Sequence, residues 1–465
     1  MNSYEQFLES KLHYGEESGF DPVFMPDMLF DFQKFLVTWN CMKGRSGTFA
    51  DCGLGKTLMQ LTWAENIARH TGKPVLILTP LAVSFQTQLE GQKIGLDVSH
   101  RREGIKAGDS IIVTNYERLH YFDRHDFAGV VCDESSILKN FKGSTKAEVT
   151  DFMRKMPYRL LCTATAAPND YIELGTSAEA LGVMGYIDML KTFFKANDNK
   201  YAQGGSGHGQ KRFEKQPFGG DFRFRGHAEK DFWRWVCSWA RAMRKPSDLG
   251  FSDEGFALPD LITNEHMIEA RRKREGFLFD LTASNNFEQR EEQRRTYEER
   301  CEMSATIING KKGQSIAWCQ LNDEGGLLEK LIPGAVEVEG SDDEDFKAET
   351  FRSFAEGKIK CIVSKPTIAG FGLNWQNCAH MTFFPSHSYE QLYQAVRRCW
   401  RFGQKNAVTV DMITTEGQSG MLRNLNRKTH AAERMFGQLV EFMGNELKIK
   451  QLTGFTKKVE IPKWM

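Results

Sequence analysis

The sequence predicts an α/β protein with two parallel-sheet domains in tandem and an insertion between them. Short apolar runs recur along the 465 residues, and each run ends in small or polar residues. Segments with helical spacing separate many of these runs, and the alternation occurs in two series. Strands that alternate with helices form parallel sheets, so two series indicate two α/β domains. The length also exceeds that of one ordinary domain.

The first series consists of five apolar runs, each of which we expect to form a strand. They are GTFAD, PVLILTP, SIIVTNY, GVVCDE and YRLLCTAT. In open parallel sheets, ligands bind at the carboxyl ends of the strands. The polar residues at these ends (Thr79, Asn115, Asp133 and Thr165) therefore mark the edge where we expect the chemistry.

The second series also consists of five apolar runs, which are QSIAWCQ, AVEVEG, KCIVSKPT, HMTFFPS and AVTVDMIT. We expect the first domain at residues 1–265 and the second at 266–465. The second domain is expected to carry a helical arm at about 270–306 and a C-terminal brace at about 430–465. The arm contains EQREEQRRTYEERCEM, which predicts a highly charged helix that projects into solvent.

A basic insertion is expected at about residues 195–230, in a stretch rich in Gly, Lys, Arg and Phe. Residues 191–250 hold 13 Lys or Arg against 6 Asp or Glu, a local net charge of +7, although the whole chain holds 61 of each. The phenylalanines of this stretch lie beside basic residues, so they could stack on nucleic acid. A surface loop without that role accounts for the composition equally well. In the following DFWRWVCSW, the helical spacing of Trp predicts core packing.

The cysteines and the N-terminus indicate a cytoplasmic protein with no membrane partner. The ten cysteines are scattered and form no CxxC pair. Several lie in or beside apolar runs, where a reduced thiol acts as a small hydrophobe, so neither a disulfide framework nor a zinc site is expected. The N-terminus is acidic and polar, unlike a signal peptide, and no apolar run approaches membrane-spanning length.

The stretch ADCGLGKT has the context of a phosphate-binding loop, since it follows an apolar strand and opens a helix. Gly53 and Gly55 permit backbone conformations that aim amide groups at an anion. Lys56 supplies a positive charge to the outer phosphates, and the Thr57 hydroxyl can ligate magnesium. Position 50 holds Ala where the general pattern has Gly.

Two adjacent carboxylates, Asp133 and Glu134, end the run GVVCDE. At a strand end beside a phosphate loop, one carboxylate can hold Mg²⁺ and the other can orient and deprotonate an attacking water. This pair predicts hydrolysis of a nucleotide by water rather than transfer of its phosphate to another substrate.

Two arginines far along the chain, in QAVRRCWRFGQ, can complete such a site. Arg398 and Arg401 are three residues apart, so we expect them on one face of a helix. An arginine from a second domain can neutralise charge that develops on the γ-phosphate, an effect of roughly 10³–10⁵ in rate. Hydrolysis would then depend on closure of the two domains, as it does in a motor.

These motifs together resemble the superfamily-two helicase-like ATPases, and within them the Swi/Snf-type translocases of double-stranded DNA. The matching stretches are ADCGLGKTLMQ, DESSILKN, RLLCTATAAPND, TIAGFGLNW and QAVRRCWRFGQ, in the family's order. Ala50 is the residue that the family ordinarily carries there. The resemblance covers about residues 27–415 and implies two RecA-like domains with ATP between them. In the acidic motif DESSILKN, Ser135-Ser136 departs from the family's usual ending. This departure puts in doubt the polar link from the last of these positions to the third motif, RLLCTATAAPND.

The resemblance also assigns roles to individual residues. Those implied in catalysis are Glu134, Arg398 and Arg401. Those implied in binding ATP are Gln33, Gly53, Gly55, Lys56, Thr57 and Gly372, of which Gln33 would recognise the adenine. Magnesium would be held by Thr57 and Asp133. Contacts to nucleic acid, or coupling to it, are implied for Thr79, Thr114, Thr163, Thr165 and Thr367.

The function that follows as an expectation is an ATP hydrolase that moves along double-stranded DNA. Two alternatives remain open: a helicase that separates strands of DNA or RNA, and a nucleotide-gated DNA-binding protein that hydrolyses slowly and recruits others. Double-stranded DNA is the expected partner, with single-stranded DNA or RNA as alternatives, and a replication or recombination protein as a further partner. The short chain favours a bacterial or phage-borne version in the cytoplasm.

Overall fold

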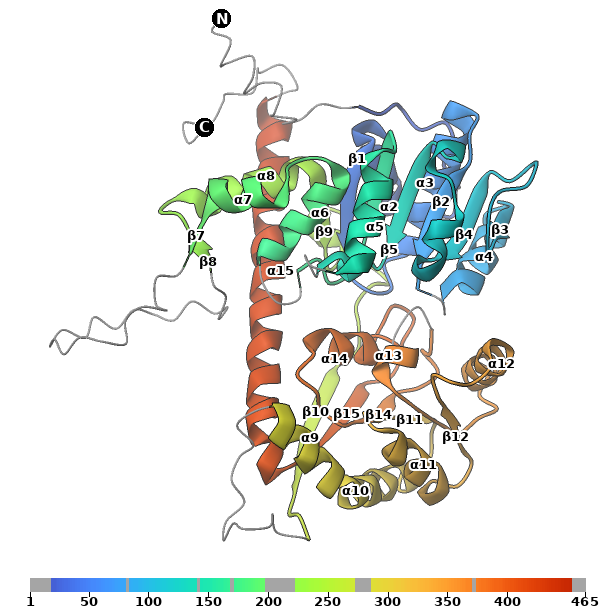
Figure 1. Ribbon diagram of the computed structural model, residues 1–465, viewed down its shortest axis with the longest axis vertical. Coiled ribbons are helices and arrows are strands. Elements are labelled where there is room, and N and C mark those ends of the chain that lie inside the picture. Colours follow the sequence, from blue (N-terminus) through green and yellow to red (C-terminus); the bar gives the residue numbers. More distant parts are fainter. Residues whose placement is uncertain are drawn as a thin grey trace, which may run out of the picture. The chain divides into compact units, whose positions relative to one another are not determined.

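The computed structural model describes residues 18–80, 83–139, 143–167, 171–196, 222–271, 286–369 and 374–453 (Figure 1). The chain divides into two compact units. Unit 1 comprises Met1–Asp253 and His430–Met465, and unit 2 comprises Glu254–Thr429. In the described residues, no helix is both long enough and apolar enough to cross a membrane.

Unit 1 is built on a seven-stranded sheet in which every neighbouring pair of strands is parallel. Its order is β3 (Val98–His100), β4 (Ile111–Asn115), β2 (Val75–Thr79), β5 (Gly129–Asp133), β6 (Tyr158–Cys162), β1 (Arg45–Ala50) and β9 (Ala240–Met243). All five apolar runs of the first series form strands, as predicted. The short strands β3 and β9 were not predicted, and both lie at the edges of the sheet.

Helices cover this sheet and close its core. They are α2 (Asp31–Lys43), α3 (Lys56–Thr71), α4 (Ser84–Lys93), α5 (Ser144–Arg154), α6 (Leu174–Leu181), α7 (Tyr186–Phe193) and α8 (Ala228–Trp239). One large apolar cluster joins alternate strand residues, such as Leu76, Leu78 and Leu161, to α5, α6 and α8. Helix α3 packs against β2, β5 and β6. Burial on both faces explains why the central strands are apolar without interruption.

The tryptophans of α8 lie in this core, which confirms the packing predicted from their spacing. Trp233, Trp235 and Trp239 are all buried. Of the basic insertion, residues 197–221 lie outside the described residues. The strands that flank them, β7 (Phe194–Ala196) and β8 (Phe222–Phe224), pair antiparallel. Phe224 stacks on Phe194 with ring centroids 4.7 Å apart, so this phenylalanine packs against the protein itself.

Unit 2 is built on a six-stranded sheet, again with every neighbouring pair parallel. Its order is β10 (Leu261–Ile268), β15 (Val408–Thr415), β14 (His380–Phe383), β11 (Ser315–Trp318), β13 (Cys361–Ser364) and β12 (Ala335–Val338). Its helices are α9 (Asn286–Arg295), α10 (Tyr297–Asn309), α11 (Asn322–Leu331), α12 (Glu344–Ala355), α13 (Pro366–Ala369) and α14 (Tyr389–Val396). The two parallel sheets confirm the predicted fold class of two RecA-like domains in tandem.

The helical arm differs from the prediction of a helix that projects into solvent. It forms two helices, and α10 places Cys301, Ala305 and Ile308 in an apolar cluster of unit 2. Arg300, on the same helix, pairs with Glu324 at 2.6 Å, and both side chains are almost completely buried. Each charge is therefore neutralised inside the protein, which allows a highly charged segment to pack against α11.

The long helix α15 (Ser419–Thr453) runs from unit 2 into unit 1. Its residues Met435, Phe436, Leu439 and Met443 are buried in the apolar cluster of unit 1. Gln438 also accepts a hydrogen bond from the Tyr171 hydroxyl at 2.7 Å. The compact units therefore divide the chain after residues 253 and 429, whereas the sequence analysis placed a single boundary after residue 265. The apolar face of α15 is the reason, because it is buried with α8.

Leu439→Ala should destabilise unit 1 by about 2–5 kcal/mol, because Leu439 is 1% exposed and its loss leaves a cavity. Urea unfolding followed by tryptophan fluorescence measures the change. The matched control is Glu441→Ala, an exposed position on the same helix, where we expect less than about 0.5 kcal/mol. Equal stability of the two variants would contradict the packing of α15 against unit 1.

Candidate active site

The segment between β1 and α3, residues 51–55, forms the candidate phosphate loop at the carboxyl edge of the unit 1 sheet. Gly53 (φ +87°) and Gly55 (φ +77°) both adopt left-handed backbone conformations. Glycine does so without the steric cost of a side chain. The loop leads into the 16-residue helix α3, whose first N–H groups and dipole favour an anion at this end. This geometry is that of an anion-binding turn.

Lys56, the first residue of α3, folds back over the loop. Its Nζ donates to the backbone carbonyl oxygens of Ala50 at 2.9 Å and of Asp51 at 3.3 Å. The ammonium group thus lies within the loop that would surround a phosphate. Thr57, next along the helix, is half-buried at the same end of α3.

Gln33, on α2, closes one side of the loop. Its Nε2 donates to the carbonyl of Leu54 at 2.9 Å, and its Oε1 accepts from the backbone N–H of Phe30 at 3.0 Å. A Cβ on Gly55 would lie 2.2 Å from Gln33 Nε2, and the positive φ of +77° would strain any residue with a side chain at this position. The side chain therefore fixes the loop, and the adenine contact that the resemblance implies stays a prediction.

Asp133, the last residue of β5, lies at the same edge as the loop. The strand order β5-β6-β1 leaves only one strand between the two. Gln60, one turn after Lys56, donates to Asp133 Oδ1 at 2.6 Å and so connects α3 to the acidic pair. Burial, followed by the charge of Glu134, raises the pKa of Asp133 to about 6, while Lys56 acts in the opposite direction.

Glu134 has φ +49°, the one non-glycine residue with positive φ in the described part of the chain. Such a conformation costs on the order of 1–3 kcal/mol and is found most often at functional sites. The side chain is directed to the strand end of β6, where the Thr163 hydroxyl lies 3.4 Å from Glu134 Oε2. Thr163 also accepts from the backbone N–H of Thr165 at 3.0 Å. The third motif thus contacts the acidic motif through Glu134.

Several buried polar atoms at this edge lack a hydrogen-bond partner among the described residues. They are Gln60 Oε1, Thr114 Oγ1, Ser135 Oγ and Thr165 Oγ1. Buried polar atoms are usually paired in native proteins, so those beside the loop and the acidic pair are available to a ligand or to ordered water. Together with the loop and two carboxylates, the donor set fits a magnesium–nucleotide complex. Thr57 and Asp133 are the residues that would hold the metal.

The arginines of unit 2 do not share a helix face, contrary to the prediction. Helix α14 ends at Val396, and Arg398 and Arg401 lie in the turns that follow. The backbone N–H of Trp375 donates to the carbonyl of Arg398 at 3.0 Å, which takes this carbonyl away from a continuing helix. Arg398 is 2% exposed, and its guanidinium donates to the backbone and side-chain oxygens of Gln394. Both arginines keep their implied role as a prediction.

The remaining residues implied by the resemblance are more dispersed. Thr79 ends β2, is fully buried and shares a hydrogen bond with Ser84 at 3.0 Å. Thr114 is buried within β4, and Thr367, in unit 2, is exposed on α13. Gly372 lies outside the described residues. Their roles in binding DNA or nucleotide therefore remain predictions.

Two residues at the site were missed by the sequence analysis. Gln60 binds Asp133, and the Tyr116 hydroxyl donates to the backbone carbonyl of Asp133. The position of Gln60, four residues after Lys56, places it on the same helix face, and this spacing could have identified it. Tyr116 follows β4 and carries no comparable signal.

Comparison with known proteins adds a partial relative. No protein-family model matches the chain. A curated relative, "Putative protein p41" of Acyrthosiphon pisum secondary endosymbiont phage 1, is 29% identical over 155 residues, which are 28% of this chain and 34% of that protein. The chain thus matches about a third of that relative's length.

Three solved structures are similar to this chain over most of its length. The Sulfolobus solfataricus SWI2/SNF2 ATPase core in complex with dsDNA has 16% identity and a TM-score of 0.41, over 92% of this chain and 98% of that one. Mycobacterium smegmatis helicase Lhr bound to ssDNA and AMP-PNP has 12% identity and a TM-score of 0.49, and the match covers 87% of this chain and 48% of that one. S. cerevisiae Dbp5 bound to RNA and ADP BeF3 has 10% identity and a TM-score of 0.49, and the match covers 88% of this chain and 93% of that one. At these identities and TM-scores the likeness concerns the course of the chain and no functional property.

Asp133→Asn should make the magnesium-free protein more stable at pH 7 and no more stable at pH 4. The raised pKa of Asp133 means that its contribution to stability is complete below its unfolded pKa and is lost as the pH rises through about 6. Asparagine stays neutral and still accepts from Gln60, so it avoids a cost of about 3 kcal/mol at pH 7. Urea unfolding at the two pH values measures this.

The control for this prediction is Asp151→Asn, at an exposed carboxyl whose pKa is lowered by its hydrogen bond from Lys155. This change should bring no gain in stability at pH 7. A stability difference for Asp133→Asn that is the same at both pH values would show that the carboxyl is not protonated in the acidic range.

Proposed function

We propose that the protein is an ATP-hydrolysing motor that couples hydrolysis to translocation on double-stranded DNA. The observation that carries the proposal is the juxtaposition at one sheet edge of a phosphate loop, its lysine and a strained acidic pair. Lys56 lies in the loop, Gln60 joins α3 to Asp133, and Glu134 is held in a left-handed conformation. The loop and its lysine serve to bind a nucleotide, and the acidic pair adds the groups that hydrolysis by water requires.

In this proposal, Gly53, Gly55 and Lys56 bind the phosphates, and Thr57 and Asp133 hold Mg²⁺. Bound Mg²⁺ neutralises charge on the phosphates. Glu134 accepts the proton of the attacking water, which requires it to be ionised at working pH. The raised pKa of Asp133 fits a position where a cation is meant to bind, because a cation would compensate the burial and the charge of Glu134.

Unit 2 is proposed to contribute Arg398 and Arg401, which would stabilise the charge that develops during hydrolysis. Arg398 is already fixed by Gln394, so it would act from a rigid support. The proposal for double-stranded DNA rests on the motif resemblance. The threonines at the strand ends, Thr79 and Thr114 among them, would serve contacts to the phosphate backbone or transmit the nucleotide state. A bacterial or phage-borne cytoplasmic protein remains part of this proposal.

Lys56→Ala and Glu134→Gln should each lower DNA-stimulated ATP hydrolysis by at least about 10²-fold, since each removes charge or the base from the reaction. Phosphate release measured with double-stranded DNA, single-stranded DNA and RNA in parallel gives the rates. Lys93→Ala, an exposed lysine on α4, is the matched control and should retain full activity. Normal turnover in Lys56→Ala or Glu134→Gln would refute the assignment of the site. Slow turnover of the unsubstituted protein, unchanged by DNA, would favour the nucleotide-gated binding protein instead.

The unsubstituted protein with ATP should displace a triplex-forming strand from duplex DNA and should not unwind a fork. Translocation along a duplex pushes off a third strand, whereas separation of base pairs requires a wedge element. Gel assays of a labelled third strand and of a labelled fork, with Glu134→Gln as the inactive control, measure both reactions. Efficient fork unwinding without triplex displacement would reassign the protein to the strand-separating helicases.

A further inference from the structure

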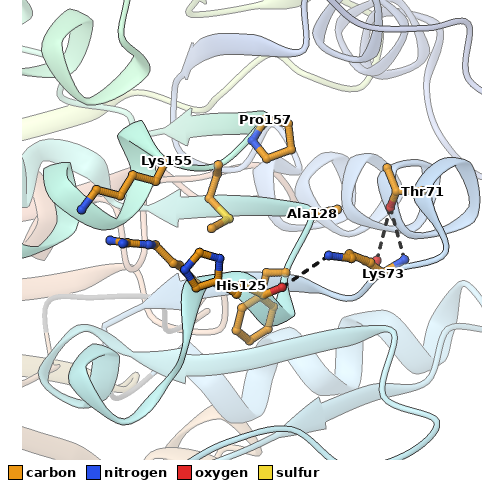
Figure 2. Close-up of a pocket in the computed structure, with 9 residues that line it drawn as sticks. Thr71, Lys73, His125, Ala128, Lys155 and Pro157 are labelled. Carbon is orange, nitrogen blue, oxygen red and sulfur yellow. Dashed lines mark hydrogen bonds between the residues drawn. The ribbon is translucent and has the colours of Figure 1, made fainter.

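A pocket of about 280 Å³ opens at the amino edge of the unit 1 sheet, away from the candidate active site (Figure 2). Its lining residues come from three connections, each of which leads into a strand. They are Thr71 and Lys73 before β2, Arg124, His125, Phe127 and Ala128 before β5, and Lys155, Met156 and Pro157 before β6. Strand β5 separates this edge from Asp133 by on the order of 13 Å. An occupant of the pocket therefore leaves the nucleotide loop accessible.

The floor of the pocket is apolar. Phe127, Ala128 and Met156 line it, and each is only 3% exposed, so these side chains are fixed by packing in the core of unit 1. Pro157 adds an exposed apolar wall. A rigid apolar floor in a pocket of about 280 Å³ can accept one inserted side chain, but not the flat surface of another protein.

The rim of the pocket is cationic. Lys73, Arg124 and Lys155 line it, and each side chain comes from a different connection. Lys73 Nζ donates to the carbonyl oxygen of His125 at 3.4 Å, as the dashed line in Figure 2 shows. Lys155 and Arg124 share one carboxylate, Asp151, at 2.8 Å and 3.5 Å. Three cations thus face the pocket with one carboxylate in contact with two of them.

The positive charge extends behind the pocket. Arg159, on β6, donates to the backbone carbonyl oxygens of Met156, Leu181 and Arg154 at 2.6–2.8 Å. Burial, followed by the charges of Arg45 and Arg154, lowers the pKa of Arg159 to about 10. Asp123 and Asp126 lie beside this edge on the connection before β5, but neither lines the pocket. The edge therefore attracts anions.

We propose that this pocket is a docking site for an acidic peptide segment of a partner protein that carries an apolar side chain. The apolar side chain occupies the floor formed by Phe127 and Met156. The flanking carboxylates of the peptide pair with Lys73, Lys155 and Arg124. At Lys155 and Arg124 these new ion pairs replace those with Asp151 or add to them. The proposal goes beyond ATP hydrolysis and translocation, since it concerns recruitment of the motor and does not depend on its DNA substrate.

The shape of the pocket favours a peptide over duplex DNA. A duplex presents its phosphates on a convex backbone and has no apolar projection that would fill a buried floor. An acidic peptide supplies both parts, because its carboxylates match the rim and one side chain matches the floor. Charge-assisted hydrogen bonds from Lys and Arg to carboxylates are also among the stronger polar contacts.

The test uses a fluorescein-labelled peptide of three aspartates, a glycine and a C-terminal phenylalanine, with binding to the full chain followed by fluorescence anisotropy. We expect the double variant Lys73→Glu with Lys155→Glu to weaken binding at least about 10-fold. The matched control, Lys93→Glu with Lys106→Glu, reverses two other exposed lysines of unit 1 and should bind normally. A peptide with asparagine for aspartate, or alanine for phenylalanine, should also bind at least about 10-fold more weakly. Basal ATP hydrolysis should be unchanged in both double variants, which shows that they are folded.

Three outcomes would overturn the proposal. The first is equal binding of the labelled peptide to both double variants. The second is a selective loss of affinity for a 20-base-pair duplex in the Lys73 and Lys155 variant, which would assign the edge to nucleic acid. The third is tighter binding of a peptide with the sequence of residues 1–17, an acidic segment of this chain, than of the aspartate peptide. That result would make the chain's own segment the occupant.

Discussion

The candidate active site depends on the parallel pairing of β5, β6 and β1. In a parallel sheet, the carboxyl ends of neighbouring strands meet at one edge, and here Asp133 pairs with Cys162, which pairs with Thr48. This register places the loop after β1, the threonines after β6 and the acidic pair after β5 in one row. The row explains how residues from three distant parts of the sequence can form one site.

Electrostatics divides the unit 1 sheet into two edges with different properties. At the carboxyl edge, burial and two adjacent carboxylates create a site that favours a cation, although Lys56 offsets part of the charge. At the amino edge, Lys73, Lys155 and the arginines around Arg159 create a site that favours an anion. The same strands connect both edges, so the two sites lie at opposite ends of one sheet and do not overlap.

The sequence predicted most of the sheets because fully buried strands are continuous apolar runs. All ten predicted runs form strands, whereas β3, β9, β10 and the short pair β7 and β8 were missed. Strand β10 is largely exposed, so its sequence LITNEHMI lacks an apolar run. It is fixed by Asp411 of β15, which accepts hydrogen bonds from Asn264 at 2.9 Å and contacts His266 at 2.8 Å. Such cross-strand polar contacts have no local signal in the sequence.

Within the candidate site, the sequence identified groups of residues that lie on one strand end or one loop. It did not identify contacts between residues on different elements. The loop, Lys56 and the acidic pair could be recognised because each is local to one strand end. The helix predicted for Arg398 and Arg401 was wrong because α14 ends at Val396 and tighter turns follow, in which the N–H of Arg398 donates to Ala395 and that of Cys399 to Val396. The carbonyl of Arg398 accepts from Trp375, a contact with a distant segment that the spacing does not predict. The packing of α10 likewise depends on Glu324, which lies on another helix.

The sequence by itself determined the alternation of strands and helices, the glycines of the loop and the chemical groups available for hydrolysis. These follow from local preferences, namely burial of apolar runs and the backbone freedom of glycine. Only the tertiary structure decided the contact of Gln60 with Asp133, the strained conformation of Glu134, the place of α15 against unit 1 and the cationic pocket at the amino edge. Each of these depends on which distant segments pack together. Packing is set by the free energy of the whole domain, and no short stretch of sequence contains that information.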